Sequence, residues 1–352
     1  MDKLTFRYKP VRHHESEPVY LVPESGEMYD GITSLTDGKS VFPASRYKDG
    51  VIAILTADEG EELVLEAGET DVGGCSAEIE DGKVAVSING KHFSDYVFEG
   101  YNKPFFGQIV DEDGVPFTRL DFETKEHPHQ RSLFIAVGDV NGIDCWNEYG
   151  NYGLVKNCAV KNVVSSSAYA SFTAENRWTD REDKSLITER TAYTVYNQPS
   201  DVKILDIETT FTADYGNVVF GATKEAGPLG IRVRDEMRCD IGSGHILNSW
   251  GARGENECWG RSAEWCDYGA DIDGAGQMGI TVFDNCKNER HPTAWHVRAY
   301  GLFAANNLFF KGGFTIQAGQ SITYRYRVIF RRKSMTNEEI SDRYVIYTLA
   351  NK

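Results

Sequence analysis

The stretch Ser321-Ile322-Thr323-Tyr324-Arg325-Tyr326-Arg327-Val328-Ile329-Phe330-Arg331-Arg332 alternates between apolar and polar residues along most of its length. Side chains two apart in an extended chain point to the same face of the strand. One face carries apolar side chains and the other mainly polar ones: Ile322, Tyr324, Tyr326, Val328 and Phe330 lie opposite Thr323, Arg325, Arg327 and Arg331. This alternation predicts a half-buried β-strand.

The same alternation recurs along the chain, between short clusters of Gly, Asn and Asp. It predicts further strands at 83–88, 186–196, 202–211 and 279–283. The clusters between such runs are turn signals, because Gly and Asn tolerate a positive φ. One helix is predicted near the end, where Thr336 and Glu339 have the spacing of a capping box. The sequence therefore predicts an all-β fold, a large β-sandwich with one or two short helices.

Composition narrows the classes of function. The chain has 352 residues and a net charge of −16, with 12% aromatic residues. An acidic surface repels phosphate groups, so we expect no nucleic-acid partner and no docking on anionic membranes. No run approaches the roughly 20 apolar residues of a membrane span. The N-terminus lacks the apolar core of a signal peptide. The seven cysteines include no Cys-x-x-Cys pair, and together these features predict a cytoplasmic protein with reduced thiols.

Tryptophan is distributed unevenly along the chain. All six tryptophans follow residue 98, whereas the preceding residues form short strands with acidic turns. This asymmetry predicts two parts: an N-terminal β layer at 1–98 and a main β-sandwich at 99–352 that carries the active site.

Two histidine-containing segments have matching patterns. In Glu126-His127-Pro128-His129-Gln130-Arg131-Ser132, an extended chain would place His127, His129 and Arg131 on one face. In Trp295-His296-Val297-Arg298-Ala299-Tyr300, the same rule puts His296, Arg298 and Tyr300 together. Such a pair of segments suits acid–base chemistry or metal binding if both line one cleft. A solvated polar face or a capped loop explains either segment equally well when it is taken alone.

Two other segments add candidate ligand contacts. Lys224 and Glu225 lie among small residues, where a ligand can approach the backbone closely. Glu225 suits a general base if its surroundings tune it, although an exposed turn carboxylate is the commoner case. Trp259 and Trp265 lie in an aromatic cluster, which either stacks on sugar rings or fills a core.

Taken together, these segments resemble a family of bacterial proteins usually labelled PmoA-like. The resemblance covers about residues 101–310 and rests on Lys103-Pro104-Phe105-Phe106, on 127–133, on 138–146, on 223–225 with 230–233, on Trp259-Gly260 with Trp265, and on 295–306. The methane-oxygenase label attached to that family does not suit this chain, which has no membrane-spanning run. Where family members often carry a further His, this chain has Gln130, which cannot shuttle protons.

The resemblance implies a sandwich related to the sugar-mutarotase supersandwich, with a carbohydrate as ligand. It also implies sugar oxidoreductases as pathway partners. Our leading hypothesis is an enzyme that moves protons on a keto-sugar or keto-glycoside, leading to elimination or hydrolysis of the glycosidic bond; a mutarotase-like or epimerase-like isomerase is the alternative. The expected acid–base groups are His127, His129, His296 and Glu225. Anionic oxygens would be bound by Arg131, Arg298 and Lys224, and sugar hydroxyls by Asp139, Asn141 and Tyr300. The rings expected to stack on the sugar are Trp259 and Trp265.

Three other interpretations stay open at this point. A divalent metal on His127, His129 and His296 would polarise the substrate carbonyl directly. A carbohydrate-binding protein without catalytic activity would use the tryptophans but not the histidines. A subunit of a larger enzyme or a homo-oligomer would need a partner chain to complete it.

Overall fold

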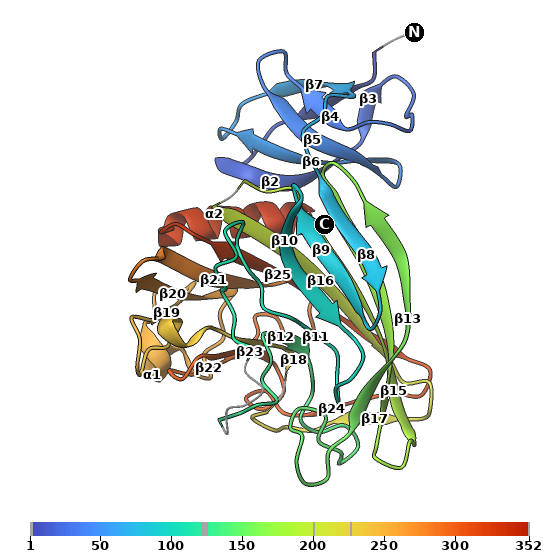
Figure 1. Ribbon diagram of the computed structural model, residues 1–352, viewed down its shortest axis with the longest axis vertical. Coiled ribbons are helices and arrows are strands. Elements are labelled where there is room, and N and C mark those ends of the chain that lie inside the picture. Colours follow the sequence, from blue (N-terminus) through green and yellow to red (C-terminus); the bar gives the residue numbers. More distant parts are fainter. Residues whose placement is uncertain (1–2, 121–125, 200, 226, 351–352) are drawn as a thin grey trace.

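The computed structural model describes residues 3–120, 126–199, 201–225 and 227–350. Two eight-stranded antiparallel sheets form most of the molecule, and a seven-stranded and a two-stranded sheet complete it (Figure 1). Helical segments of the described chain are α1 (Gly254–Cys258), α2 (Asn337–Ala350) and a single 3-10 turn (Asp235–Met237). The predicted all-β sandwich with one or two short helices is therefore confirmed. Within the described residues, no helix is both long and apolar enough to cross a membrane.

The first eight-stranded sheet contains the strand predicted at 321–332. Its strands in spatial order are β13 (Leu154–Ser165), β14 (Tyr169–Thr179), β15 (Ser185–Tyr196), β16 (Val202–Thr212), β25 (Ser321–Arg331), β21 (Gly276–Asp284), β20 (Trp265–Ile272) and β19 (His245–Asn248). β25 lies inside the sheet, paired to β16 along its whole length and to β21 on its other side. A strand with both edges paired leaves no open hydrogen-bonding edge at this point.

The second eight-stranded sheet faces the first and carries the candidate site. In spatial order it consists of β22 (Trp295–Val297), β23 (Leu302–Asn306), β18 (Pro228–Arg232), β12 (Leu133–Ile135), β11 (Phe105–Phe106), β10 (Lys91–Val97), β9 (Lys83–Ile88) and β8 (Cys75–Glu80). The small sheet pairs β17 (Val218–Phe220) with β24 (Phe314–Ile316).

The main hydrophobic core lies between the two large sheets. Apolar residues from one face of each sheet form one continuous buried cluster. Aromatic rings join across the layer: Phe93 meets Phe330 edge-on with ring centroids 6.0 Å apart, and Tyr96 lies 5.1 Å from Tyr193. Such aromatic pairs stabilise a core beyond the area they bury.

The polar face of β25 is partly solvated at Thr323 and Arg325, as predicted for a half-buried strand, but buried at Arg327 and Arg331. Arg331 is 3% exposed, and its guanidinium donates to both carboxylate oxygens of Asp267, at 2.6 and 2.9 Å. A Cβ on Gly279 would lie 2.2 Å from the Arg331 Cζ, so only glycine leaves room for this side chain. Arg331 can be buried because the carboxylate of Asp267 pairs with its charge.

The seven-stranded sheet lies as a separate layer at the N-terminal end of the molecule (Figure 1). Its strands in spatial order are β2 (His14–Leu21), β6 (Gly50–Ala57), β5 (Val41–Tyr47), β4 (Ser34–Thr36), β7 (Leu63–Gly68), β1 (Thr5–Tyr8) and β3 (Pro23–Ser25). The predicted layer at 1–98 was too long. β8, β9 and β10 belong to the second eight-stranded sheet, because β10 pairs directly with β11, so the boundary lies between Gly68 and Cys75.

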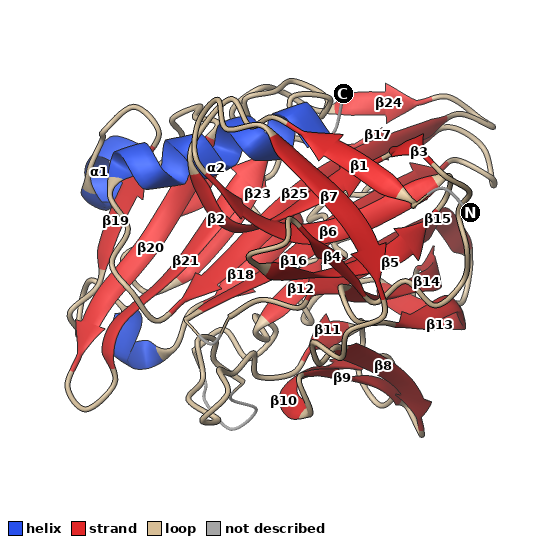
Figure 2. Cartoon of the chain, turned by 90° about the horizontal axis from the view of Figure 1, so that it is seen from above, coloured by secondary structure: helices blue, strands red, loops and turns tan. Residues whose placement is uncertain are grey.

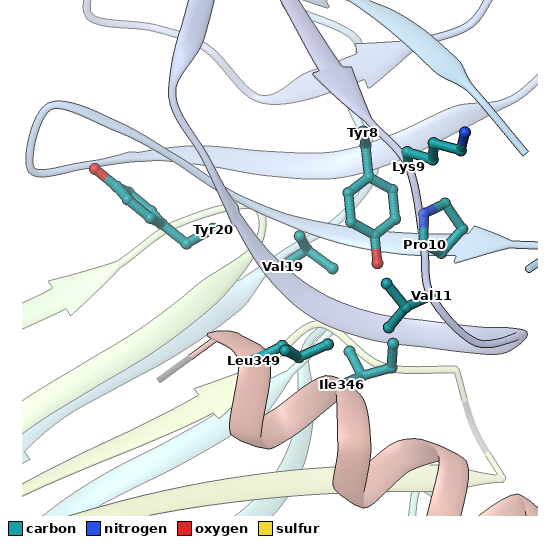
Figure 3. A pocket seen from close by; sticks show the side chains of 8 residues that line it. All are labelled: Tyr8, Lys9, Pro10, Val11, Val19, Tyr20, Ile346 and Leu349. Carbon is teal, nitrogen blue, oxygen red and sulfur yellow. The ribbon is translucent and has the colours of Figure 1, made fainter. Parts of the chain in front are cut away.

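Helix α2 packs on the outer face of the first large sheet and reaches the N-terminal layer (Figure 2). The capping box predicted for it is present: the Thr336 amide donates to Glu339 Oε2 at 2.6 Å, and the Glu339 amide donates to Thr336 Oγ1 at 3.2 Å. Figure 3 shows the last turns of α2 facing the strand that carries Val19 across a cavity of about 390 Å³.

A buried carboxylate links the N-terminal layer to this helix and to β25. Glu17 of β2 is 0% exposed. Its Oε2 accepts a hydrogen bond from Arg327 at 3.0 Å, and its Oε1 accepts one from Arg343 of α2. One side chain therefore bridges two buried arginines that belong to different elements, and Arg327 pairs with Asp206 as well.

We predict that Glu17→Ala lowers the free energy of unfolding by about 3–5 kcal/mol, because it leaves the buried Arg343 without its carboxylate partner. Urea denaturation followed by tryptophan fluorescence measures this. Glu66→Ala is the matched control, since Glu66 pairs with Lys3 at the surface and an exposed pair contributes little. Equal midpoints for the two variants would contradict the assigned role of Glu17.

Candidate active site

The candidate site is built on a row of residues that crosses the second large sheet. The strand register places His296 opposite Ala304, and Ala304 opposite Gly230. Their neighbours along the strands belong to the core between the sheets, so this row faces the outer side. A Cβ on Gly230 would lie 2.7 Å from Phe134 Cζ and 2.9 Å from Trp146 Cη2, so glycine makes room for these two rings.

His296 is held by an indole. It is 3% exposed, and its Nδ1 lies 3.0 Å from Trp259 Nε1, which donates the hydrogen bond. Burial first, and then the positive charges of Arg298 and Lys224, lower the pKa of His296 to about 3. The ring is therefore neutral near pH 7. Trp259 itself remains 38% exposed.

Arg298 and Tyr300 extend from the same side as His296. The Arg298 guanidinium lies 5.5 Å from the Tyr300 ring centroid and 6.0 Å from that of Trp259. Its Nε is 2.8 Å from Glu255 Oε1 of α1. The strand ends at Val297, and the Gly301 amide donates to the Arg298 carbonyl at 3.0 Å, so Arg298 and Tyr300 lie in a turn and not in the extended chain predicted for them. Their contacts give the arginine aromatic surfaces on which a cation packs well.

The first histidine segment forms a turn, so the predicted extended conformation was wrong. The Gln130 amide donates to the His127 carbonyl at 3.0 Å, and His127 has a φ of 52°. Pro128 takes the second position of this turn, where its fixed φ is favoured. The turn still keeps the rings of His127 and His129 close, with centroids 6.0 Å apart.

The two histidine segments meet at Tyr300. The rings of His127 and Tyr300 are stacked, with centroids 4.9 Å apart and planes 3° from parallel. The guanidinium of the fully buried Arg232 lies 4.9 Å from the same Tyr300 ring. Arg232 also donates to Gln130 Oε1 at 2.8 Å and to Glu126 Oε1 at 3.3 Å. Gln130 is thus a structural contact of Arg232.

The two neighbouring histidines differ in access. The side chain of His127 is 40% exposed. Burial and the charge of Arg232 lower the pKa of His127. His129 is only 4% exposed, and burial together with the charge of Lys103 lowers its pKa to about 3. His127 is therefore the more exposed histidine of this pair.

Glu148 joins this site although the sequence analysis did not single it out. It accepts two hydrogen bonds from Arg131, at 2.5 and 2.8 Å, and one from the buried Lys103 at 3.0 Å. These partners lower the pKa of Glu148 to about 2 against the cost of burial. Because Arg131 is 8% exposed and paired here, it serves this network. No sequence pattern pointed to Glu148, whose partners come from distant segments.

A cavity of about 670 Å³ opens beside the histidine turn. Its lining residues are Glu126, His127, Pro128, His129, Glu148 and Tyr149. His296 and Glu225 are not among its lining residues. The site therefore has two parts, the cavity beside His127 and the region around His296. Tyr300 connects them, because its ring stacks on that of His127.

The Lys224–Glu225 loop stands near both parts. Lys224 Nζ lies 3.4 Å from Glu225 Oε1, with side chains 53% and 33% exposed. The charge of Lys224 lowers the pKa of both His296 and His127, and the charge of Glu225 raises that of Tyr300. Such effects require proximity, so the loop lies within electrostatic reach of both histidine segments.

Three residues expected at the site have other roles in the structure. Trp265 is 1% exposed and packs among apolar residues beneath α2, so its ring has no open face for a sugar. The Asp139 carboxylate accepts from the Gly142 amide at 2.7 Å within a turn. Asn141 Oδ1 accepts from the Val219 amide at 2.7 Å. The prediction that Trp265 stacks on a sugar ring is wrong, because its ring is buried.

The histidines do not form a metal centre within the described chain. Among these residues, no group of three or more His, Cys, Asp and Glu side chains is arranged to hold a metal ion. His296 also uses Nδ1 for Trp259. The candidate divalent metal on His127, His129 and His296 is therefore not supported by the geometry.

Comparison with known proteins adds a family. A family model described as a family of unknown function, DUF6807, matches residues 83–344. The chain belongs to this family. In this DUF6807 protein the matched region contains every residue of the candidate site and leaves out the N-terminal sheet. The family description states no activity, and the PmoA-like label stays a prediction.

Two other comparisons add little to this assignment. No curated protein matches the chain. Among solved structures it is similar to galactose 1-epimerase from Lactobacillus acidophilus NCFM, with 7% identity, a TM-score of 0.31 and coverage of 74% of this chain and 98% of that chain. So low a TM-score carries no argument about activity.

We predict that Glu148→Gln lowers stability at pH 7 by about 3–5 kcal/mol, because Lys103 is left buried without its carboxylate. The folded pKa of Glu148, about 2, lies below its ordinary value of 4.5. The stabilisation by the carboxylate is therefore complete above pH 4.5 and lost as the pH falls towards 2. Urea denaturation between pH 2 and 7 should show wild type and variant converging in acid. Glu208→Gln, at a surface pair, is the control, and a difference independent of pH would contradict this account.

Proposed function

We propose that this DUF6807 protein is an enzyme of carbohydrate catabolism that moves protons on a keto-sugar or keto-glycoside. The observation that supports it most strongly is the meeting of the two histidine segments, with the His127 ring stacked on Tyr300 and Arg298 5.5 Å from the Tyr300 ring. A carbonyl acidifies the adjacent C–H bond, so a positioned base removes that proton and a positioned acid assists the leaving group.

His127 and Glu225 are the groups proposed to accept and return the proton. Both side chains are partly exposed, at 40% and 33%. The lowered pKa of His127 keeps its ring neutral near pH 7, so that it can take up a proton. His129 and His296 are more deeply buried and neutral, and we propose that they contact the substrate or hold its neighbours.

Arg298 and Lys224 are proposed to bind oxygens on which negative charge develops. Both are cations within reach of the histidines, and a fixed cation in a partly buried site stabilises such charge. The exposed part of Trp259 would pack against the apolar face of a sugar ring, as tryptophan does at many carbohydrate sites. An oxidoreductase that converts a sugar hydroxyl to a ketone would supply this substrate.

A carbohydrate-binding protein without catalysis is the second candidate. The exposed rings of Trp259 and Tyr149, at 38% and 66%, favour it. This candidate needs no proton transfer, and the buried neutral state of His129 and His296 is compatible with it.

We predict that the protein catalyses exchange of the C–H proton beside the carbonyl of a keto-glycoside in D2O, followed by proton NMR. His127→Ala and Glu225→Gln should each slow the exchange by about 10²–10⁴-fold, as expected for loss of a general acid or base. Release of the aglycone would indicate cleavage of the glycosidic bond, whereas an inverted centre in an intact glycoside would indicate the isomerase.

His13→Ala is the matched control, because His13 is exposed on the N-terminal layer and pairs with Asp58. Its exchange rate should equal that of the wild type. Unchanged exchange in His127→Ala would contradict the proton-transfer role. Binding of the keto-glycoside without exchange in any variant would favour the carbohydrate-binding protein.

A further inference from the structure

The hydrogen bond between Trp259 and His296 fixes where the proton of this histidine resides. An indole N–H is a donor only, so His296 Nδ1 must accept with its lone pair at 3.0 Å. In a neutral imidazole one nitrogen accepts and the other carries the hydrogen. His296 is therefore in the tautomer that carries its hydrogen on Nε2.

The surroundings of His296 keep it neutral and leave Nε2 accessible. Nε2 has no hydrogen-bond partner among the described residues, yet it is not one of the fully buried unpaired atoms, so it retains contact with solvent. The charged groups that act on the ring, Arg298 and Lys224, are both positive and disfavour a second proton, as burial does. His296 thus offers one N–H donor at the site.

Trp259 is itself held in a fixed position. Its amide donates to the Glu255 carbonyl at 2.8 Å at the end of α1, and the Gly260 amide donates to the Trp295 carbonyl at 2.8 Å. Phe310 packs edge-on against the indole, with ring centroids 5.0 Å apart. Gly260 has a φ of 73°, and a Cβ there would lie 2.7 Å from the Phe310 ring. The direction of the indole N–H is therefore set by packing.

We propose that Trp259 is a positioning residue that holds His296 as an Nε2–H donor, and that His296 stabilises the oxygen of the enolate formed from a keto-sugar instead of removing the proton. This inference rests on the proposed function and assigns roles within it. A neutral imidazole that donates to a developing enolate oxygen is established chemistry for proton abstraction beside a carbonyl.

The step balances as follows. His127 or Glu225 takes the proton from the carbon beside the carbonyl, and the C–H electron pair forms a carbon–carbon double bond. The carbonyl π electrons move to oxygen, which accepts a hydrogen bond from His296 Nε2. When the oxygen electrons return to the carbonyl, the electron pair of the carbon–carbon double bond has two routes. It takes a proton back onto the same carbon, or it forms a double bond to the neighbouring carbon while the C–O bond of that carbon breaks. In the second route the glycosidic oxygen leaves with the bonding pair and receives the proton held by His127 or Glu225. His296 keeps its hydrogen throughout.

Nitrogen-15 NMR of the protein with labelled histidine tests the tautomer directly. The wild-type spectrum, with His296 assigned by comparison with His296→Gln, should show a protonated Nε2 and an unprotonated Nδ1 near pH 7. Trp259→Phe removes the donor and should give a mixture of tautomers. Trp250→Phe is the control, because Trp250 is 71% exposed and should leave the signal unchanged. A protonated Nδ1 in the wild type overturns the proposal, even if Trp259→Phe does not fold.

The exchange rates of His296 variants distinguish a hydrogen-bond donor to the enolate oxygen from a group that carries the proton. His296→Ala should slow exchange by about 10²–10³-fold, the usual loss for one oxyanion donor. His296→Gln keeps an N–H donor, so its exchange rate should be at least about tenfold higher than that of His296→Ala. Equal loss in both variants overturns the donor role. If no keto-sugar reacts, the proposed function fails and the enolate role with it, while the NMR spectrum still decides whether Trp259 sets the tautomer.

Discussion

The arrangement of this site depends on the buried guanidinium of Arg232. It lies on β18 without exposure to solvent, donates to Gln130 and Glu126, and packs over the Tyr300 ring. A buried charge must be paired and hydrogen-bonded to be tolerated. The histidine turn and the segment after β22 therefore close around one cation, which brings His127 onto Tyr300. Arginine suits this position because its planar fork both donates and stacks.

Buried arginines paired with carboxylates occur elsewhere in the structure too. Glu17 pairs with arginines from β25 and α2, and the pair of Arg331 with Asp267 lies inside the first large sheet. The chain as a whole carries a net charge of −16, whereas Arg232, Lys103 and Arg131 lie buried around the site. Each of these cations has a carboxylate partner, Glu126 or Glu148.

The order of residue types predicted the fold class, because a strand that buries one face alternates apolar and polar residues. The strands predicted at 83–88 and 202–211 and the capping box of α2 follow from local spacing. The boundary at residue 98 did not follow, because the pairing of β10 with β11 joins segments through long-range hydrogen bonds that no local pattern encodes. The turn at His127 was missed because Pro128 suits both a strand edge and a turn.

Residue types alone determined that this is a β-sandwich and that histidine, arginine and tryptophan are its candidate ligand contacts. Tertiary structure decided which of them are accessible. Trp265 and Trp259 have the same side chain, yet one fills the core and the other is exposed and donates to His296. Nothing in the sequence distinguishes Glu148 from other carboxylates, whereas the fold pairs it with Arg131 and Lys103. Exposure, pKa and tautomer are set by neighbours in space, and neighbours in space are decided only when the sheets pack.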